Sequence, residues 1–142
     1  MSLKVELLAE SFGSLLPQKE AFAKTFYSNL FSVYPQTRLL FKDTDMKLQE
    51  TSLMAALGLV ISSLKKSDYD QLALVLQRLG QRHEGYGVTS EHYWMVGNVL
   101  LRTFADFLGN QWTPELNDAW ADAYQAVVTL MQPAAESATA TI

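Results

Sequence analysis

Apolar residues recur every three or four positions along almost the whole of this 142-residue chain. That spacing is typical of amphipathic α-helices, and no stretch alternates apolar and polar residues as a half-buried strand would. The pattern therefore predicts an all-α fold. We expect one domain over residues 1–142, with a helical core of about 3–131 and a frayed, small-residue tail over 132–142.

Proline positions divide the first part of this pattern into helices. The first helix is predicted over about residues 4–15, and Pro17 suits the first turn of a second helix. The dipeptide Tyr34-Pro35 should end that second helix, because the residue before a proline is pushed out of the α region. Pro35 can then begin a short helix that leads to Phe41.

Capping residues and one apolar stripe predict the helices in the rest of the chain. The stripe has helical spacing and consists of Met46, Gln49, Leu53, Leu57, Val60 and Leu64. Ser67 and Asp70 resemble a capping box, so a further helix should begin just after Ser67. Thr89 and Thr113 are expected to cap the last two helices, and Pro133 to end the final one.

Composition excludes several classes of protein. The chain has no cysteine, so disulfides, thiolate metal sites and a cysteine nucleophile are absent. With 11 basic and 15 acidic residues its net charge is −4, which argues against nucleic acid or an anionic membrane as partner. No run approaches the ~20 apolar residues of a membrane-spanning helix. We therefore expect a cytoplasmic protein.

The two histidines, His83 and His92, are too few for a multi-histidine metal cluster. His83 ends the aliphatic helix face of Leu72, Leu76 and Leu79. A lone histidine on such a face is most often a hydrogen-bonded core or boundary residue. It is also how a protein presents one axial ligand to haem iron. His92 lies near a predicted helix start, where a surface or cap-adjacent role is expected.

Three segments carry a family resemblance: AFAKTFYSNLFSVYPQTRLLF, MKLQETSLMAAL and LGQRHEGYGVTSEHYWMVGNVLL. They resemble the signature segments of globins, and more narrowly those of bacterial single-domain globins and of the haem domain of flavohaemoglobins. The similarity covers about residues 3–131. It implies a globin fold, with helices packed around a pocket for haem b, which is iron protoporphyrin IX.

The resemblance also implies roles for individual residues. His83 matches the proximal iron ligand, Phe41 the ring stacked on haem, and Tyr27 the distal tyrosine. Gln49 falls where animal globins usually have a distal histidine, and Leu53 closes the pocket one turn later. Without the resemblance, Tyr27 would be interpreted as a boundary tyrosine, Gln49 as a surface residue and Phe41 as core.

Further cofactor contacts are expected on the proximal side. They are Leu79, Arg82, Val88, Tyr93 and Val96. Tyr93 matches a tyrosine that joins a His–Tyr–Glu network in flavohaemoglobin-like globins. The position that matches the glutamate falls near Ala135, with Glu136 one residue out of register and Pro133 expected to end the helix before it, so whether Glu136 joins the network stays open. Arg82 could reach a haem propionate, although a solvated charge explains it equally well.

The function that the resemblance implies is binding of O2, NO or CO at ferrous haem iron. Tyr27 and Gln49 would both donate hydrogen bonds to O2, which implies slow release and high affinity rather than bulk oxygen transport. We expect a monomer or weak homodimer.

Two alternatives remain at this point. One is an NO dioxygenase or another haem-based redox enzyme. The chain ends near residue 142 and has no G-x-G-x-x-G motif, so such an enzyme would need a separate reductase as partner. The other is a gas-sensing module that acts on a partner in trans, and a visible spectrum would first establish whether haem is bound.

Overall fold

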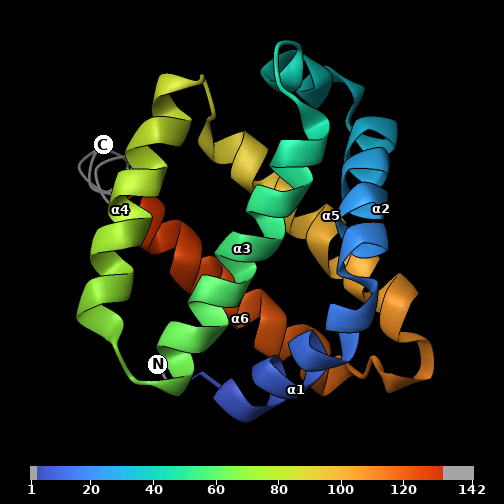
Figure 1. Cartoon of the computed structure of the whole chain (residues 1–142), viewed down its shortest axis with the longest axis vertical. Coiled ribbons are helices and arrows are strands. Elements are labelled where there is room, and N and C mark those ends of the chain that lie inside the picture. Colours follow the sequence, from blue (N-terminus) through green and yellow to red (C-terminus); the bar gives the residue numbers. More distant parts are fainter. Residues whose placement is uncertain (1–2, 133–142) are drawn as a thin grey trace.

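The computed structural model describes residues 3–132, which form helices and no strand. The six α-helices and three short 3-10 helices are α1 Val5–Leu15, η1 Leu16–Gln18, α2 Lys19–Val33, η2 Pro35–Phe41, α3 Met46–Lys65, α4 Tyr69–Gly85, α5 Ser90–Leu108, η3 Gly109–Gln111 and α6 Pro114–Met131. The all-α prediction is confirmed. Figure 1 shows the helices crossing one another rather than running as a parallel bundle.

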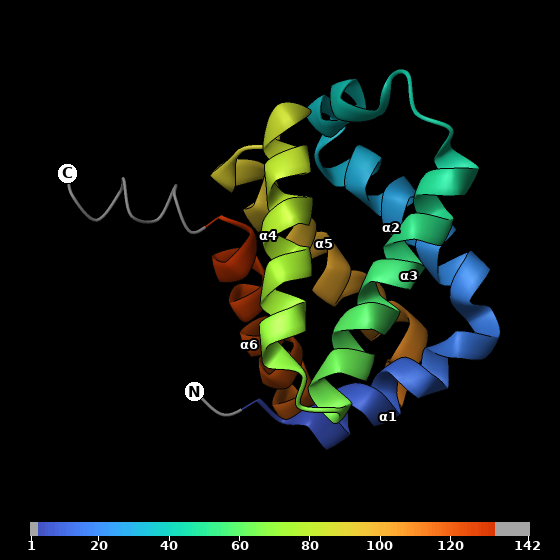
Figure 2. The ribbon, with the colours of Figure 1, turned by 60° about the vertical axis from the view of Figure 1, so that its left-hand side comes forward.

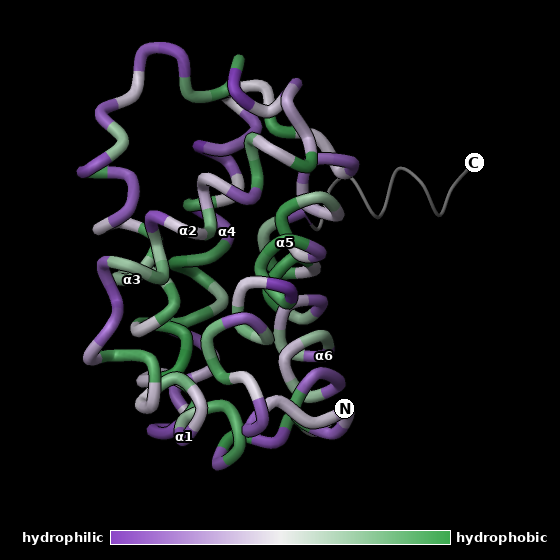
Figure 3. Tube along the Cα trace, turned by 90° about the vertical axis from the view of Figure 1, so that its right-hand side faces the viewer, coloured by the Kyte–Doolittle hydropathy of each residue, from purple (hydrophilic) through white to green (hydrophobic). Residues whose placement is uncertain are grey.

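The helices pack so that distant segments become neighbours. α2 packs against α3 and α5, while α4 packs against α6. Figures 1 and 2 both place α1 at one end of the molecule and η2 at the other, with α3 and α4 spanning the distance between them. Hydrophilic residues gather on the outer turns of the trace (Figure 3). The inward helix faces are therefore available for a core and a cavity.

An aromatic core ties α2, α5 and α6 together. Phe104 is fully buried, with its ring centroid 4.9 Å from that of Phe22 and 4.2 Å from that of Trp120. The indole N–H of Trp120 donates to the Ser11 hydroxyl at 2.9 Å, which satisfies a buried donor. These contacts hold the helices whose remaining faces line the site.

Glycine lets α4 and α6 approach closely. A Cβ atom at Gly80 would overlap the backbone carbonyl of Met131, near the end of α6. Gly97 on α5 plays a similar part, since a Cβ there would lie 2.7 Å from the ring of Tyr124. A larger residue at Gly80 would push α4 away from α6, and one at Gly97 would displace the Tyr124 ring that packs between α5 and α6.

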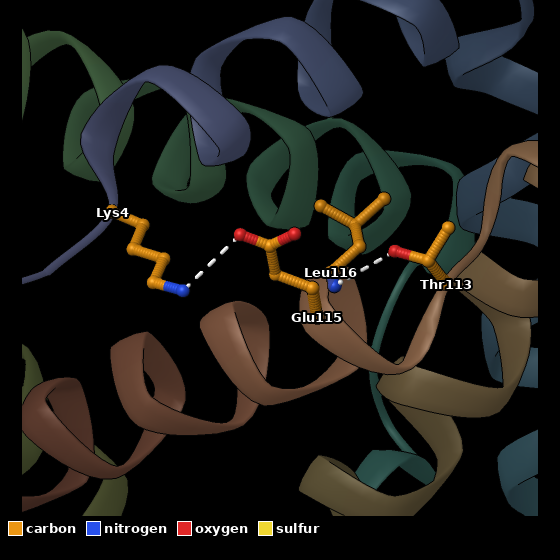
Figure 4. Close-up of polar contacts among 4 residues, drawn as sticks. All are labelled: Lys4, Thr113, Glu115 and Leu116. Carbon is orange, nitrogen blue, oxygen red and sulfur yellow. Dashed lines mark hydrogen bonds and ion pairs between the residues drawn. The ribbon is translucent and has the colours of Figure 1, made fainter.

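The predicted starts of the last two helices are confirmed. Thr113 accepts a hydrogen bond from the Leu116 N–H at 3.1 Å, and Pro114 is the first residue of α6 (Figure 4). Lys4 and Glu115 form an ion pair of 3.2 Å beside this cap. Both side chains are exposed, so the pair adds little stability. Thr89 caps α5 in the same way.

Two local predictions were wrong. Ser67 does not cap α4, because it adopts the left-handed conformation (φ 56°) that ends α3. The Ser67 and Asp68 N–H groups bond back to the Leu64 and Ser63 carbonyls, as in a Schellman motif. Pro17 lies in η1, so α2 begins only at Lys19. Tyr34 does end α2 as predicted.

The predictions for Pro133, Glu136 and the tail from 133 onward lie outside the described residues. Among residues 3–132, no helix is long and apolar enough to cross a membrane.

Candidate functional site

A cavity of about 540 Å³ opens between α2, α3, α4, α5 and α6. Its walls are mainly aliphatic and aromatic, and its volume lies within the roughly 300–1,000 Å³ of small-molecule and cofactor pockets. Nine of the ten predicted site residues line it: Tyr27, Phe41, Gln49, Leu53, Leu79, His83, Val88, Tyr93 and Val96. Tertiary packing thus brings together side chains from four different α-helices and from the segments that connect them.

The hydrogen bond of His83 fixes which ring nitrogen carries the proton. Its Nδ1 lies 2.8 Å from the backbone carbonyl of Leu79, one helical turn earlier. A carbonyl can only accept, so Nδ1–H donates and the lone pair of Nε2 is free. Burial lowers the pKa of His83, although the Leu79 carbonyl acts in the opposite direction. His83 is therefore a neutral imidazole suited to bind a metal.

Tyr93 lies against His83 on the same wall. The two rings are nearly parallel, with an interplanar angle of 22° and centroids 6.2 Å apart. The Tyr93 hydroxyl is buried and has no hydrogen-bond partner among residues 3–132. Burial raises the pKa of Tyr93, and the charge of Glu84 raises it further. The His–Tyr–Glu network stays a prediction, because Glu136 is outside the described chain.

Tyr27 and Gln49 meet in the cavity from two different helices. The side-chain Nε2 of Gln49, on α3, donates to the phenolic oxygen of Tyr27, on α2, at 3.0 Å. Since the phenol oxygen accepts this bond, its own O–H remains available as a donor. Burial raises the pKa of Tyr27 to about 12, although the Gln49 bond works in the opposite direction. The hydroxyl is therefore protonated at neutral pH.

Phe41 is held at the corner where η2 ends. Its ring centroid lies 5.5 Å from that of Tyr27 and 5.6 Å from that of Phe31, both in edge-on contact. Such contacts fix the orientation of an aromatic ring beyond what burial alone achieves. The half-buried Phe41 thus presents a positioned apolar surface to the cavity.

Arg82 and His92 differ in their relation to the cavity. Arg82 is exposed and is not among the residues that line the cavity. His92 does have the predicted cap-adjacent role, because its Nδ1 accepts a hydrogen bond from the Thr89 N–H at 3.0 Å. It also lines the cavity, which the sequence did not indicate.

Other residues line the cavity but were not predicted from the sequence as site residues. Leu57 and Val60 lie on the stripe of Leu53, so their spacing could have placed them in the cavity. Tyr124 lies on the corresponding stripe of α6, between Trp120 and Val127, which also line the cavity. Its hydroxyl donates to the Tyr93 carbonyl at 2.7 Å, and burial raises its pKa. Tyr124 thereby ties α6 to the α5 wall of the cavity.

These residues suit one kind of metal cofactor. No group of three or more His, Cys, Asp or Glu side chains that could hold a bare ion occurs in residues 3–132. The cavity instead offers the Nε2 lone pair of His83 and a large apolar surface, which fits a metal carried inside an organic ring. Fold and cavity together define a helical protein with an apolar pocket that a planar cofactor would fit, and with one histidine whose free Nε2 faces no hydrogen-bond partner among residues 3–132.

Comparison with known proteins identifies the family. The model of the Globin family matches residues 24–131, so the chain belongs to the globins. Globins are haem proteins that bind diatomic gases, and their iron is held by a proximal histidine.

Individual relatives fall into two groups. Flavohemoproteins of Bordetella pertussis and Bacillus subtilis are 31% and 25% identical, over 92% and 87% of this chain. The chain spans only about a third of their lengths, 33% and 31%. An anaerobic nitrite reductase of Oryza sativa subsp. indica is 27% identical over 89% of this chain and 90% of its own length.

Proposed function

We propose that this globin holds haem b and binds O2, and also NO and CO, at ferrous iron with high O2 affinity. The observation that carries the proposal is one cavity that contains both the free Nε2 of His83 and the free O–H of Tyr27. The first can bind iron, and the second can donate to a gas ligand.

Four of the predicted site residues then have a physical task. His83 binds the iron, while Phe41 and Leu53 offer apolar surface to the ring and keep water away from the ligand. When bound, haem supplies a ferrous iron that takes a diatomic gas. The Tyr27 hydroxyl would donate a hydrogen bond to bound O2, which accepts such a bond more strongly than CO does, and would thereby retain O2 selectively. Hydrogen bonds to charged acceptors contribute about 1.5–3 kcal/mol.

A redox function is the second candidate, and two observations favour it. Relatives of this chain are named flavohemoproteins and anaerobic nitrite reductase. Tyr93, with its unpartnered hydroxyl, lies directly against the proximal His83. As an NO dioxygenase the protein would combine NO, O2 and one electron to give nitrate, with the electron coming from a reductase domain or partner.

A purified sample can test the proposal and separate the two functions. We expect haem to be taken up with a Soret band and O2 to bind reversibly after reduction. Failure to take up haem contradicts the proposal. Catalytic consumption of NO in the presence of a generic reductase, against at most one NO per haem without it, would establish the enzyme.

Gln49→Leu should speed O2 release less than removal of the Tyr27 hydroxyl does. Gln49 donates to the Tyr27 oxygen, so part of its effect on the ligand must pass through that hydroxyl. We expect the effect of Gln49→Leu to shrink strongly in a Tyr27→Phe background, as measured by stopped-flow O2 dissociation in a double-mutant cycle. Lys47→Leu, exposed on the same helix, is the control. Additive effects would show that Gln49 acts on O2 directly.

A further inference from the structure

Within residues 3–132, the cavity lining contains no permanently charged cation. Among its lining residues there is neither lysine nor arginine, and Arg82 lies outside it. Haem b nevertheless carries propionate carboxylates, which need hydrogen-bond donors or water where they leave an apolar pocket. The polar side chains of the lining are therefore the candidates to receive them.

Several donors of the lining are already engaged. The His83 Nδ1–H bonds to the Leu79 carbonyl, and the Tyr124 hydroxyl bonds to the Tyr93 carbonyl. The Thr37 hydroxyl donates to the Tyr34 carbonyl at 2.7 Å. None of the hydrogen bonds found in residues 3–132 uses Nε2 of His92, and the lining hydroxyls of Thr44, Ser52, Tyr86 and Tyr93 are also unbonded there. His92 differs from these hydroxyls because a capping hydrogen bond on its other ring nitrogen holds the ring in place.

The capping contact of His92 determines its tautomer. Nδ1 accepts the backbone N–H of Thr89 at 3.0 Å, so the neutral ring must carry its proton on Nε2. The same contact holds the half-buried ring in one orientation, since the Thr89 hydroxyl also lies 3.2 Å from Nδ1. His92 is thus a fixed N–H donor at the cavity wall, while His83 presents a lone pair.

We propose that His92 is a cofactor-binding residue whose Nε2–H donates a hydrogen bond to a haem carboxylate. This inference rests on the proposed function, because it requires haem in the cavity. It divides the two histidines by tautomer: His83 binds iron through a free lone pair, and His92 binds the anionic edge through a free N–H. Arg82, the residue that sequence analysis offered for this task, is outside the cavity.

The test is the rate at which haem is lost to an excess of a haem-scavenging apoprotein. The substitution His92→Glu completes an ordinary Thr-x-x-Glu capping box with Thr89, so the start of α5 is preserved. It also replaces the N–H donor with a charge of the same sign as the haem carboxylate. We expect haem b to be lost about tenfold faster than from wild type, while thermal unfolding of the apoprotein shows no loss of stability.

Haem dimethyl ester, which has no free carboxylate, isolates the interaction. With this cofactor His92→Glu and wild type should lose haem at nearly equal rates. Equal rates with haem b, or the same acceleration with the ester, would overturn the role of His92. His92→Gln keeps both the cap and an N–H donor. Its rate of haem b loss should therefore lie between the rates of wild type and His92→Glu.

Arg82→Glu is the matched control on the outer face of α4. It replaces a positive charge with a negative one outside the cavity. We therefore expect little effect on the rate of haem loss. An ester-sensitive effect of Arg82→Glu with none in His92→Glu would assign the carboxylate to Arg82 instead. Failure of the wild-type protein to take up haem would contradict the proposed function itself, so the two failures are distinguishable.

Discussion

His83→Ala should release haem more than about 100-fold faster than wild type. Partners that only orient a metal ligand typically change metal affinity by about 10–100-fold, so loss of the ligand itself should exceed that range. Apolar contacts with residues such as Phe41 would be left to hold the cofactor. The measurement is Soret absorbance per protein after gel filtration, together with the rate of haem transfer to a scavenger.

Two controls accompany this prediction. Free imidazole should restore haem binding to His83→Ala, because it can occupy the space left by the ring and supply the missing nitrogen. His92→Gln retains its cap and a donor, so its haem loss should be far smaller. Equal haem loss in His83→Ala and His92→Gln would show that His83 is not the iron ligand.

Tyr27→Phe should speed O2 dissociation by roughly ten- to over a hundredfold. A hydrogen bond to a charged acceptor contributes about 1.5–3 kcal/mol, and each ~1.4 kcal/mol is a factor of ten. Because the pKa of Tyr27 is about 12, the hydroxyl keeps its proton across the physiological range and the effect should not depend on pH there. Stopped-flow mixing of the O2-loaded protein with CO measures the rate.

The comparison of O2 with CO provides the control for Tyr27→Phe. CO accumulates much less negative charge than O2, so CO dissociation should change far less in Tyr27→Phe. Phenylalanine keeps the ring contacts with Phe26 and Phe41, so packing should survive. O2 release that is unchanged in Tyr27→Phe but accelerated in Gln49→Leu would identify Gln49 as the donor to O2.

Local signals in the sequence were sufficient at several helix boundaries that depend on adjacent residues. Pro35 restricts Tyr34, and Thr113 with Pro114 caps and begins α6, because these effects act within one turn. The error at Ser67 has the same local origin. Two helices meet there, and the closure of α3 uses the residue that the capping pattern assigned to α4. Sequence spacing alone could not determine which helix would use it.

The sequence by itself determined the helical periodicity and the place of His83 on an apolar face, because both depend on residues within a few turns of one another. It also indicated the family, because each of the three signature segments can be recognised without knowledge of the packing. Even the His83–Leu79 hydrogen bond spans only four residues. The Tyr27–Gln49 bond required α2 and α3 to pack, and the cavity position of His92 required the turn between α4 and α5. Only tertiary structure decided these, since side chains on different helices meet through packing that no local pattern specifies.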